Sequence, residues 1–364
     1  MLLLGCVILI IILSIYFFMH GAQFGAMPQG ESLQKIVASP NYRDGQFQNL
    51  SNTPQLTEGA SFFGILKKFL FDKSGQRIPP APLPSLKTDL LNLNKDKNIL
   101  VWFGHSSYFM QIDHRTFLID PVFSGNASPL KFTTKSFKGS DIYTVADFPA
   151  IDYLIISHDH WDHLDYRTIL QLKPKVRKAI TGLGTAAHLL SWGYDKNLIE
   201  EKDWNEQIIP EVGFVLNTTP ARHFSGRGFK RNRSIWLSFV LTTPSKKIFI
   251  GGDSGYDSHF AEIGNLFGPF DLAILEDGQY NKYWKYIHMN PEETVQAAID
   301  LKAKKLLPVH WGKFSLSIHS WDEPIIRINK EAEHRDVKLL HPMIGEMVDL
   351  DINQTFSSWW EGIS

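Results

Sequence analysis

Seven consecutive residues hold three imidazoles and two carboxylates: Ser157-His158-Asp159-His160-Trp161-Asp162-His163. An apolar run typical of a strand, 151–156, precedes them, and a helix-like segment, 164–172, follows. Alternate side chains at a strand end share one face, so His158 and His160 should point the same way and could bind one metal ion. Asp162 and His163 can turn toward a second ion. Imidazole nitrogens and carboxylate oxygens suit zinc, and also iron or manganese. The alternative, a solvated His-rich loop, is disfavoured because such a dense cluster would repel itself once protonated.

Three later residues of metal-ligand type each follow an apolar, strand-like run: His223, Asp253 and His310. A lone histidine after a strand is more often a structural residue with a hydrogen-bonded ring. Four strand exits in chain order that all carry His or Asp reverse that expectation. The single cysteine, Cys6, excludes a Cys-based zinc site, so the ligands must be His, Asp or Glu.

Two further residues are candidates for supporting the ligands. Asp120 ends the strand-like run 116–119, and an acid at a strand end that faces a metal loop is a good partner for an imidazole N–H. An equally weighted alternative is that Asp120 only starts a turn before Pro121. His105, in the turn after the run 99–103, is the second candidate.

Strand-like and helix-like segments alternate through most of the chain, which predicts an α/β fold. Strands are predicted over 99–103, 108–112, 116–119, 152–156, 177–181, 208–219, 234–243, 247–250, 271–275 and 305–309, with a hairpin turn at 243–246. Helices are predicted over 164–172, 185–192 and 291–301. Residues 21–86 are rich in turn-forming residues and predict an irregular arm, and the domain proper is placed at 87–364.

The N-terminal segment, residues 1–20, is almost wholly apolar from Leu2 to Met19 and carries no charge. As a helix it would be about 27 Å long, just enough to cross a hydrocarbon core of roughly 30 Å with some thinning. It therefore predicts a transmembrane helix that anchors the protein in a membrane; a cleaved signal and a soluble start are alternatives. Lys35 and Arg43 beyond it favour a domain on the cytoplasmic face, with a periplasmic or soluble cytoplasmic location as alternatives.

Composition indicates a globular, enzyme-sized protein. The chain has 364 residues, of which 43% are hydrophobic and 21% charged, so it can bury a large core. Its net charge of -1 gives no basic excess of the kind that holds many phosphates. A nucleic-acid partner is therefore not expected, and the oligomeric state is left open.

The ordered set of seven candidate ligands resembles that of the metallo-β-lactamase superfamily of binuclear hydrolases, over residues 87–350. The resemblance implies a four-layer αβ/βα sandwich with the site at one edge of its two sheets. It implies that one metal is held by a first set of ligands, namely His158, His160 and His223. It implies that a second metal is held by a second set, namely Asp162, His163 and His310. Asp253 would bridge the two ions, which are expected to be Zn²⁺, with Fe or Mn as alternatives.

Flanking motifs narrow the resemblance to the group that contains the N-acylphosphatidylethanolamine-hydrolysing phospholipase D, and some are similar to bacterial members. The motifs are Trp102-Phe103-Gly104-His105-Ser106, residues 117–124, 288–293 and 308–312, and, for the bacterial members, 24–25 and 39–47. His288 resembles a catalytic position near the substrate phosphate or leaving group; its alternative is a neighbour of a helix N-terminus. Asp162 could orient the nucleophile as well as bind metal.

The leading hypothesis is a zinc-dependent phosphodiesterase of phospholipase D type that acts on a membrane lipid through a metal-bound hydroxide. Nearby aromatic residues could lie at the headgroup level or be ordinary core or lid residues: Tyr280, Tyr283, Trp284 and Tyr286. One alternative is a lactonase or phosphodiesterase for a small soluble metabolite. A second is a membrane-anchored scaffold without catalysis. A β-lactamase is disfavoured because no ligand position holds cysteine, and an oxygen-reducing di-iron protein because His160 stands where those proteins tend to carry Glu.

Overall fold

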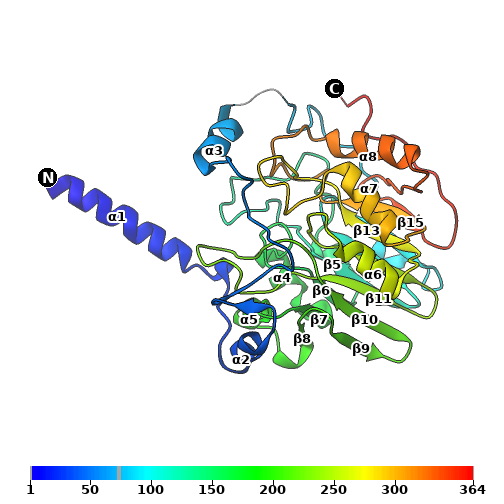
Figure 1. The fold of residues 1–364 in the computed structure, drawn as a ribbon, viewed down its shortest axis with the longest axis horizontal. Helices are drawn as coiled ribbons and strands as arrows, with labels where there is room; N and C mark the ends of the chain where they lie inside the picture. Colours follow the sequence, from blue (N-terminus) through cyan, green and yellow to red (C-terminus); the bar gives the residue numbers. More distant parts are fainter. Residues whose placement is uncertain (1, 72–74, 364) are drawn as a thin grey trace.

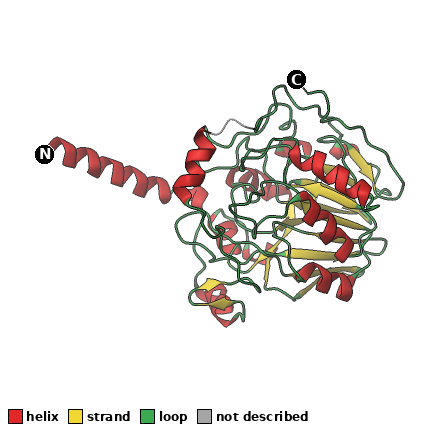
Figure 2. Ribbon diagram, turned by 45° about the horizontal axis from the view of Figure 1, so that its top comes forward, coloured by secondary structure: helices red, strands yellow, loops and turns green. Residues whose placement is uncertain are grey.

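A computed structural model of the chain describes residues 2–71 and 75–363 (Figure 1). Met1 and Ser364 lie outside this part, so the predicted segments 1–20 and 87–364 each extend one residue beyond it, and the predicted arm includes residues 72–74, which also lie outside. Two mixed β-sheets form the body of the protein, and helices lie beside them (Figure 2).

The larger sheet has seven strands, and all of the first four predicted strands belong to it. In spatial order they are β15 (Met347–Asp349), β3 (Ile99–Trp102), β4 (Tyr108–Ile112), β5 (Arg115–Ile119), β6 (Ile151–Ile156), β7 (Val176–Gly182) and β8 (Ile199–Lys202). Neighbours from β15 to β5 are antiparallel. Neighbours from β5 to β8 are parallel, so the carboxyl ends of β5 and β6 meet at one edge.

The second sheet has six strands. In spatial order they are β14 (Leu306–Val309), β13 (Leu272–Glu276), β12 (Lys247–Ile250), β11 (Ser238–Thr242), β10 (Phe214–Thr219) and β9 (Gln207–Glu211). β12, β13 and β14 are parallel, and the remaining pairs are antiparallel. The predicted hairpin at 243–246 joins β11 to β12 as expected. The single strand predicted over 208–219 is wrong, because Gly213, with a φ of 86°, turns the chain back and divides it into β9 and β10.

Helices complete the layers. They are α4 (Tyr166–Leu172), α5 (Ala186–Ser191), α6 (His259–Phe267), α7 (Pro291–Asp300) and α8 (Glu323–His334), with 3₁₀ turns at Ala22–Phe24, Leu90–Asn92, Val145–Asp147, Lys173–Lys175 and Lys196–Leu198. Along β3, Leu100 and Trp102 join a cluster with the six-stranded sheet, whereas Ile99 and Val101 pack in a cluster with α4 and α5. Both faces of the larger sheet are therefore buried, as in the αβ/βα sandwich that the resemblance implies.

The N-terminal part has more regular secondary structure than predicted. It contains α2 (Gly30–Ala38), a two-stranded sheet of β1 (Tyr42–Arg43) and β2 (Gln46–Phe47), and α3 (Phe62–Phe71). The expectation of an irregular arm is therefore wrong for these segments. On α3, Ile65 and Phe69 lie one turn apart and are half-buried, whereas Phe62, Phe63 and Phe71 are exposed.

The helix α1 (Leu2–Met19) projects from the body (Figures 1 and 2). Most of its apolar side chains between Leu3 and Phe17 are exposed. Within residues 2–71 and 75–363, no helix is both long enough and apolar enough to cross a membrane. The transmembrane helix predicted over Leu2–Met19 is thus not found.

Candidate metal centre

Ligand-type side chains converge where strands of both sheets end. The loop after β6 carries the motif of residues 158–163, while β10, β12 and β14 lead to His223, Asp253 and His310. The strands β6, β12 and β14 are largely buried and rich in branched apolar residues, so each fixes the position of the polar residue that follows it. The four strand exits that the sequence predicts to form one site are brought together in the structure.

The first set places its ring nitrogens around one point. His160 Nδ1 lies 2.9 Å from His158 Nε2 and 3.2 Å from His223 Nε2. Asp253 Oδ2 lies 3.8 Å from His158 Nε2 and 3.6 Å from His223 Nε2. Burial lowers the pKa of all three imidazoles, to about 4 for His160, so the rings are neutral and their nitrogens are free to bind a cation.

The second set also lies close to Asp253. Asp253 Oδ1 is 3.2 Å from His310 Nδ1, and Asp253 Oδ2 is 3.2 Å from His163 Nε2. Asp162 Oδ2 is 3.5 Å from His163 Nε2. Asp253 therefore lies within 3.8 Å of ring nitrogens from both sets. Burial lowers the pKa of His310 as well, which leaves its ring neutral.

The donors fit divalent metal ions. Among the described residues, His163 Nε2 and Asp253 Oδ1 are buried without a hydrogen-bond partner, which is costly unless a ligand occupies the space between them. Burial opposes ionisation of Asp253, but His163 and His310 hold its pKa well below the ordinary value. Burial also opposes charge on His163, yet Asp253, Asp162 and Asp120 raise its pKa well above the ordinary value. The site therefore carries excess negative charge that bound cations would neutralise.

Both predicted supporting residues contact a candidate ligand. Asp120 Oδ2 lies 2.8 Å from His163 Nδ1, and the same carboxylate accepts hydrogen bonds from the backbone N–H and hydroxyl of Ser157. His105 Nε2 lies 2.8 Å from Asp162 Oδ2. His105 is also close enough to join the second set as a ligand, because the four donor atoms lie within 4.8 Å of one another. The geometry favours His105 as a residue that holds Asp162 in place, since its Nε2 is already engaged with that carboxylate.

His288 lies beside the centre and has a partner that sequence reasoning missed. Its Nδ1 is 2.5 Å from Glu276 Oε2, and its ring centroid is 5.0 Å from that of His223 and 5.1 Å from that of His310. Glu276 is fully buried at the end of β13, and its Oε1 accepts hydrogen bonds from two backbone N–H groups. Burial opposes charge on His288, but Glu276 raises its pKa above the ordinary value. The strand exit after 271–275 was recognised in the sequence, yet nothing local linked its acid to His288.

The neighbouring Asp277 is buried, and neither carboxyl oxygen has a hydrogen-bond partner among the described residues. Burial raises its pKa well above the ordinary value, so the folded protein binds a proton that the unfolded chain releases above a pKa of about 3.9. Asp277 therefore costs stability as the pH rises above that value. We expect Asp277→Asn to gain stability relative to the native chain between pH 5 and 8, by up to about 1.4 kcal/mol per pH unit until the folded-state pKa is passed. Urea unfolding of the metal-loaded protein measures this, and a pH-independent difference would contradict it.

A cavity of about 500 Å³ opens onto the centre. Its lining includes polar residues of the centre, namely His160, Asp162, His223, Asp253, His288 and His310. It also includes apolar residues of α3, namely Phe62, Ile65, Leu66 and Phe69. Trp284 also lines this cavity, whereas Tyr280 is buried and donates a hydrogen bond to Glu323. Of the alternatives for these aromatic residues, Trp284 is therefore placed as a lid residue would be, and Tyr280 is a core residue.

A family model described as a beta-lactamase superfamily domain matches residues 115–311, more than half of the chain. The chain belongs to the metallo-β-lactamase superfamily. This matched region contains all seven candidate ligands. The protein is thus a metal-dependent hydrolase of this superfamily, with an α/β fold and a buried His/Asp centre.

Relatives of this superfamily member cover most of its length. An uncharacterized protein of Mycobacterium tuberculosis is 36% identical over 348 residues, 94% of this chain and 93% of its own. N-acyl-phosphatidylethanolamine-hydrolyzing phospholipase D 1 of Caenorhabditis elegans is 28% identical over 311 residues, 78% of this chain and 82% of its own. Among solved structures, the metallo hydrolase Igni18 of Ignicoccus hospitalis aligns with a TM-score of 0.53 at 20% identity, over 69% of this chain and 97% of its own, which shows a shared fold.

Proposed function

We propose that the protein is a binuclear, zinc-dependent phosphodiesterase of phospholipase D type that cleaves N-acylphosphatidylethanolamine-like lipids. The observation that carries the proposal is the cavity, which joins the candidate metal centre to an apolar wall from α3. A substrate that fits it has a polar reacting group and an apolar chain. The similarity to the phospholipase D of Caenorhabditis elegans supports a phosphodiester as the reacting group.

The residues divide the work of such a reaction. The first and second sets, together with Asp253, would each hold a divalent ion, and the ions would lower the pKa of bound water and offset charge on the phosphate. His288 contributes a proton near the leaving oxygen, and Glu276 holds its ring in place. Asp162, fixed by His105, is placed to orient the attacking water.

A membrane lipid would approach from the side of α3 and α1. Phe62, Phe63 and Phe71 of α3 have exposed side chains, and Lys67 and Lys68 lie on the same helix. Apolar and basic residues on one short helix are typical of a segment that lies at the surface of a bilayer. We therefore propose that the protein contacts the membrane with α3 beside the opening of the cavity, and that the exposed α1 contributes to this contact.

The proposal is tested by incubating the zinc-loaded, detergent-solubilised full chain with N-acylphosphatidylethanolamine and detecting products by mass spectrometry. Formation of phosphatidic acid and the N-acylethanolamine supports it. Two bound metals together with an intact lipid, and turnover of a soluble phosphodiester or lactone instead, would reject the lipid substrate while keeping the metal centre. Stable folding with no bound transition metal, and no gain on adding zinc, would favour the non-catalytic scaffold.

The apolar wall gives a further prediction. Leu66→Glu is expected to raise KM for a longer-chain N-acyl substrate by about 10-fold or more, because burying a leucine-sized contact is worth about 1.5–3 kcal/mol. A short-chain analogue should be hardly affected. Both substrates are used as dissolved monomers, so that membrane contact plays no part.

Phe63→Glu is the matched control, because Phe63 lies on the same helix but points to solvent with 80% of its side chain exposed. It should leave KM for both monomers unchanged. Equal effects of Leu66→Glu on the short and longer substrates would show that the apolar wall does not bind the chain.

A further inference from the structure

The side chain of Asp159 joins the two loops that carry the first set. Asp159 lies between His158 and His160 but points away from them and is buried. Its Oδ1 accepts a hydrogen bond of 2.6 Å from the backbone N–H of Gly226, in the loop that begins with His223. Its Oδ2 accepts one of 2.9 Å from Ser234. A single carboxylate thus ties the His158–His160 loop to the His223 loop.

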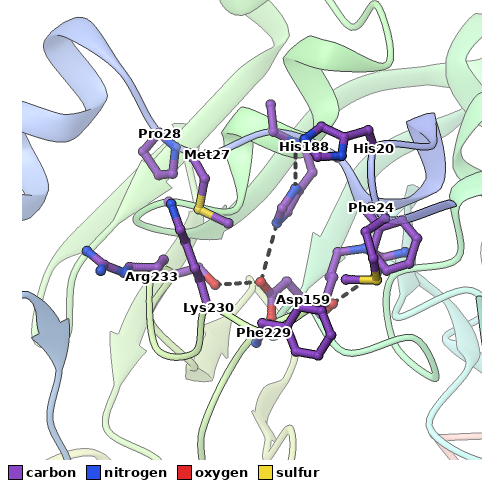
Figure 3. Close-up of a pocket in the computed structure, with 17 residues that line it drawn as sticks. His20, Phe24, Met27, Pro28, Asp159, His188, Phe229, Lys230 and Arg233 are labelled. Atoms are coloured by element: carbon purple, nitrogen blue, oxygen red, sulfur yellow. Dashed lines mark hydrogen bonds and ion pairs between the residues drawn. The ribbon is translucent and has the colours of Figure 1, made fainter. Parts of the chain in front are cut away.

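His188 of α5 holds this carboxylate from behind. Its Nε2 lies 3.3 Å from Asp159 Oδ2, and its Nδ1 accepts a hydrogen bond of 3.2 Å from the backbone N–H of Ala26 (Figure 3). Because Nδ1 is the acceptor, the proton is on Nε2 and faces the carboxylate. The N-terminal arm therefore sets both the tautomer and the orientation of His188.

The contact at Ala26 is possible only because residue 25 is glycine. Gly25 has a φ of 72°, and a Cβ on it would lie 2.0 Å from His188 Nδ1. Phe24, the residue before it, packs edge-on against Trp161 of the metal-binding motif, with 5.2 Å between ring centroids. Adjacent residues of the arm thus contact the motif and His188, and they line a cavity of about 310 Å³.

Arg227 makes a second connection between the arm and the motif. Its guanidinium lies 3.8 Å from the ring centroid of Trp161 and is almost fully buried. It donates hydrogen bonds to the carbonyl oxygens of Gln23, Asp159 and Leu164. The arm, the motif and the His223 loop are therefore joined by hydrogen bonds through Arg227 and Asp159.

We propose that Asp159, oriented by His188 and through it by the arm at Gly25-Ala26, is the positioning residue for the first set. The proposal rests on the binuclear centre of the proposed function but not on its lipid substrate. Asp159 touches neither metal donor atoms nor the cavity that receives substrate. It fixes the spacing of the three imidazoles, and the arm segment 22–26 is thereby part of the metal centre.

The test measures zinc affinity of the full chain by competition with a chromophoric chelator, which resolves a first and a second ion. Two substitutions of His188 separate its two contacts. In His188→Asn the amide oxygen can keep the bond from Ala26 but the contact with Asp159 is lost. In His188→Gln the amide N–H can still reach Asp159. We expect His188→Asn to lower the affinity for one of the two zinc ions by about 10- to 100-fold, the usual cost of losing a supporting partner of a ligand. The zinc affinities of His188→Gln should stay near the native values.

Gly25→Ala is the second variant, and it changes only the arm. The added Cβ should displace the His188 ring and lower the affinity for the same zinc ion, while the affinity for the other ion stays unchanged. Glu31→Gln is the control, because it breaks an exposed ion pair between the arm and Lys196 without touching the motif, and both affinities should remain native.

Selective loss of one ion in His188→Asn and Gly25→Ala, with the native midpoint of thermal unfolding in the metal-free state, supports the proposal. Native affinity for both ions in these variants overturns it. An equal loss of both ions together with a lower unfolding midpoint also overturns it, because a general structural role then accounts for the result. If His188→Asn does not fold, Gly25→Ala alone decides by the same criteria. A native chain that binds no zinc would reject the binuclear centre itself, whereas binding of two ions without lipid hydrolysis would leave this inference testable and reject only the substrate.

Discussion

Replacement of Asp253 by Asn is expected to lower kcat/KM by at least about 10³-fold, beyond the roughly 10²- to 10³-fold loss that is typical of one preorganised electrostatic contact. One carboxylate faces both sets, with Oδ1 3.2 Å from His310 and Oδ2 3.2 Å from His163. An amide keeps one of these oxygens and replaces the other with an N–H₂ group that cannot bind a cation. The substitution therefore removes one donor atom and one of the two carboxylate charges, those of Asp162 and Asp253, among the candidate ligands.

The same variant should bind fewer than two metal ions, while the strands that carry the site remain folded, because β12 is buried by apolar contacts that the substitution does not touch. Metal content by mass spectrometry and hydrolysis of the lipid and of a soluble phosphodiester measure the two effects. His160→Ala is expected to act in the same direction through the first set.

Asp257→Asn is the matched control. It makes the same chemical change four residues away, at a carboxylate that faces Arg222 rather than the metal centre. It should retain two ions and native turnover. Two tightly bound ions and normal turnover in Asp253→Asn would overturn the binuclear assignment.

The sequence predicted the candidate ligands because their signal is local. An apolar run followed directly by His or Asp marks a strand exit, and both sheets deliver such exits to one edge. His158 and His223 are separated by 65 positions but needed no contact information to be recognised. The chain order and residue types were enough once several exits were read together.

The supporting residues could be predicted only in part, since their roles depend on contacts between distant elements. Asp120 and His105 were found because each also ends or follows a strand. Glu276 ends a strand too, but its partner His288 lies in another loop and the pairing has no local pattern. His188 lies within a helix, and nothing in the sequence of α5 distinguishes it from an ordinary buried residue.

The role of α3 was missed for a related reason. Its apolar residues were visible in the sequence, but they lie about 90 positions before His158, in a segment whose turn-forming neighbours indicated an irregular arm. Only the folded chain shows that Leu66 and Phe69 line the same cavity as the candidate ligands. The bounds of α1 agree with the predicted apolar segment Leu2–Met19, whereas the predicted membrane-spanning helix is not found among the described residues.

The His288–Glu276 pair leads to a prediction about the leaving group. Nδ1 of His288 is occupied by Glu276 at 2.5 Å, so the other ring nitrogen is the one available to the centre. The buried carboxylate raises the pKa of His288, which favours a ring that carries a proton to donate. A general acid matters most when the departing oxygen is a poor leaving group, as the alkoxide of an ethanolamine is, and least when it leaves readily, as a nitrophenolate does.

We therefore expect His288→Ala to slow cleavage of an alkyl phosphodiester by about 10²- to 10⁴-fold but to have a much smaller effect on the matching nitrophenyl diester. Glu276→Gln should show the same selectivity to a smaller degree, because it keeps a hydrogen bond to His288 but removes the charge that holds its proton. Measuring kcat for the two diesters in each variant, at native metal content, gives the comparison. A role for His288 in binding the phosphate alone would slow both diesters equally, and that result would remove the general-acid assignment while leaving the metal centre intact.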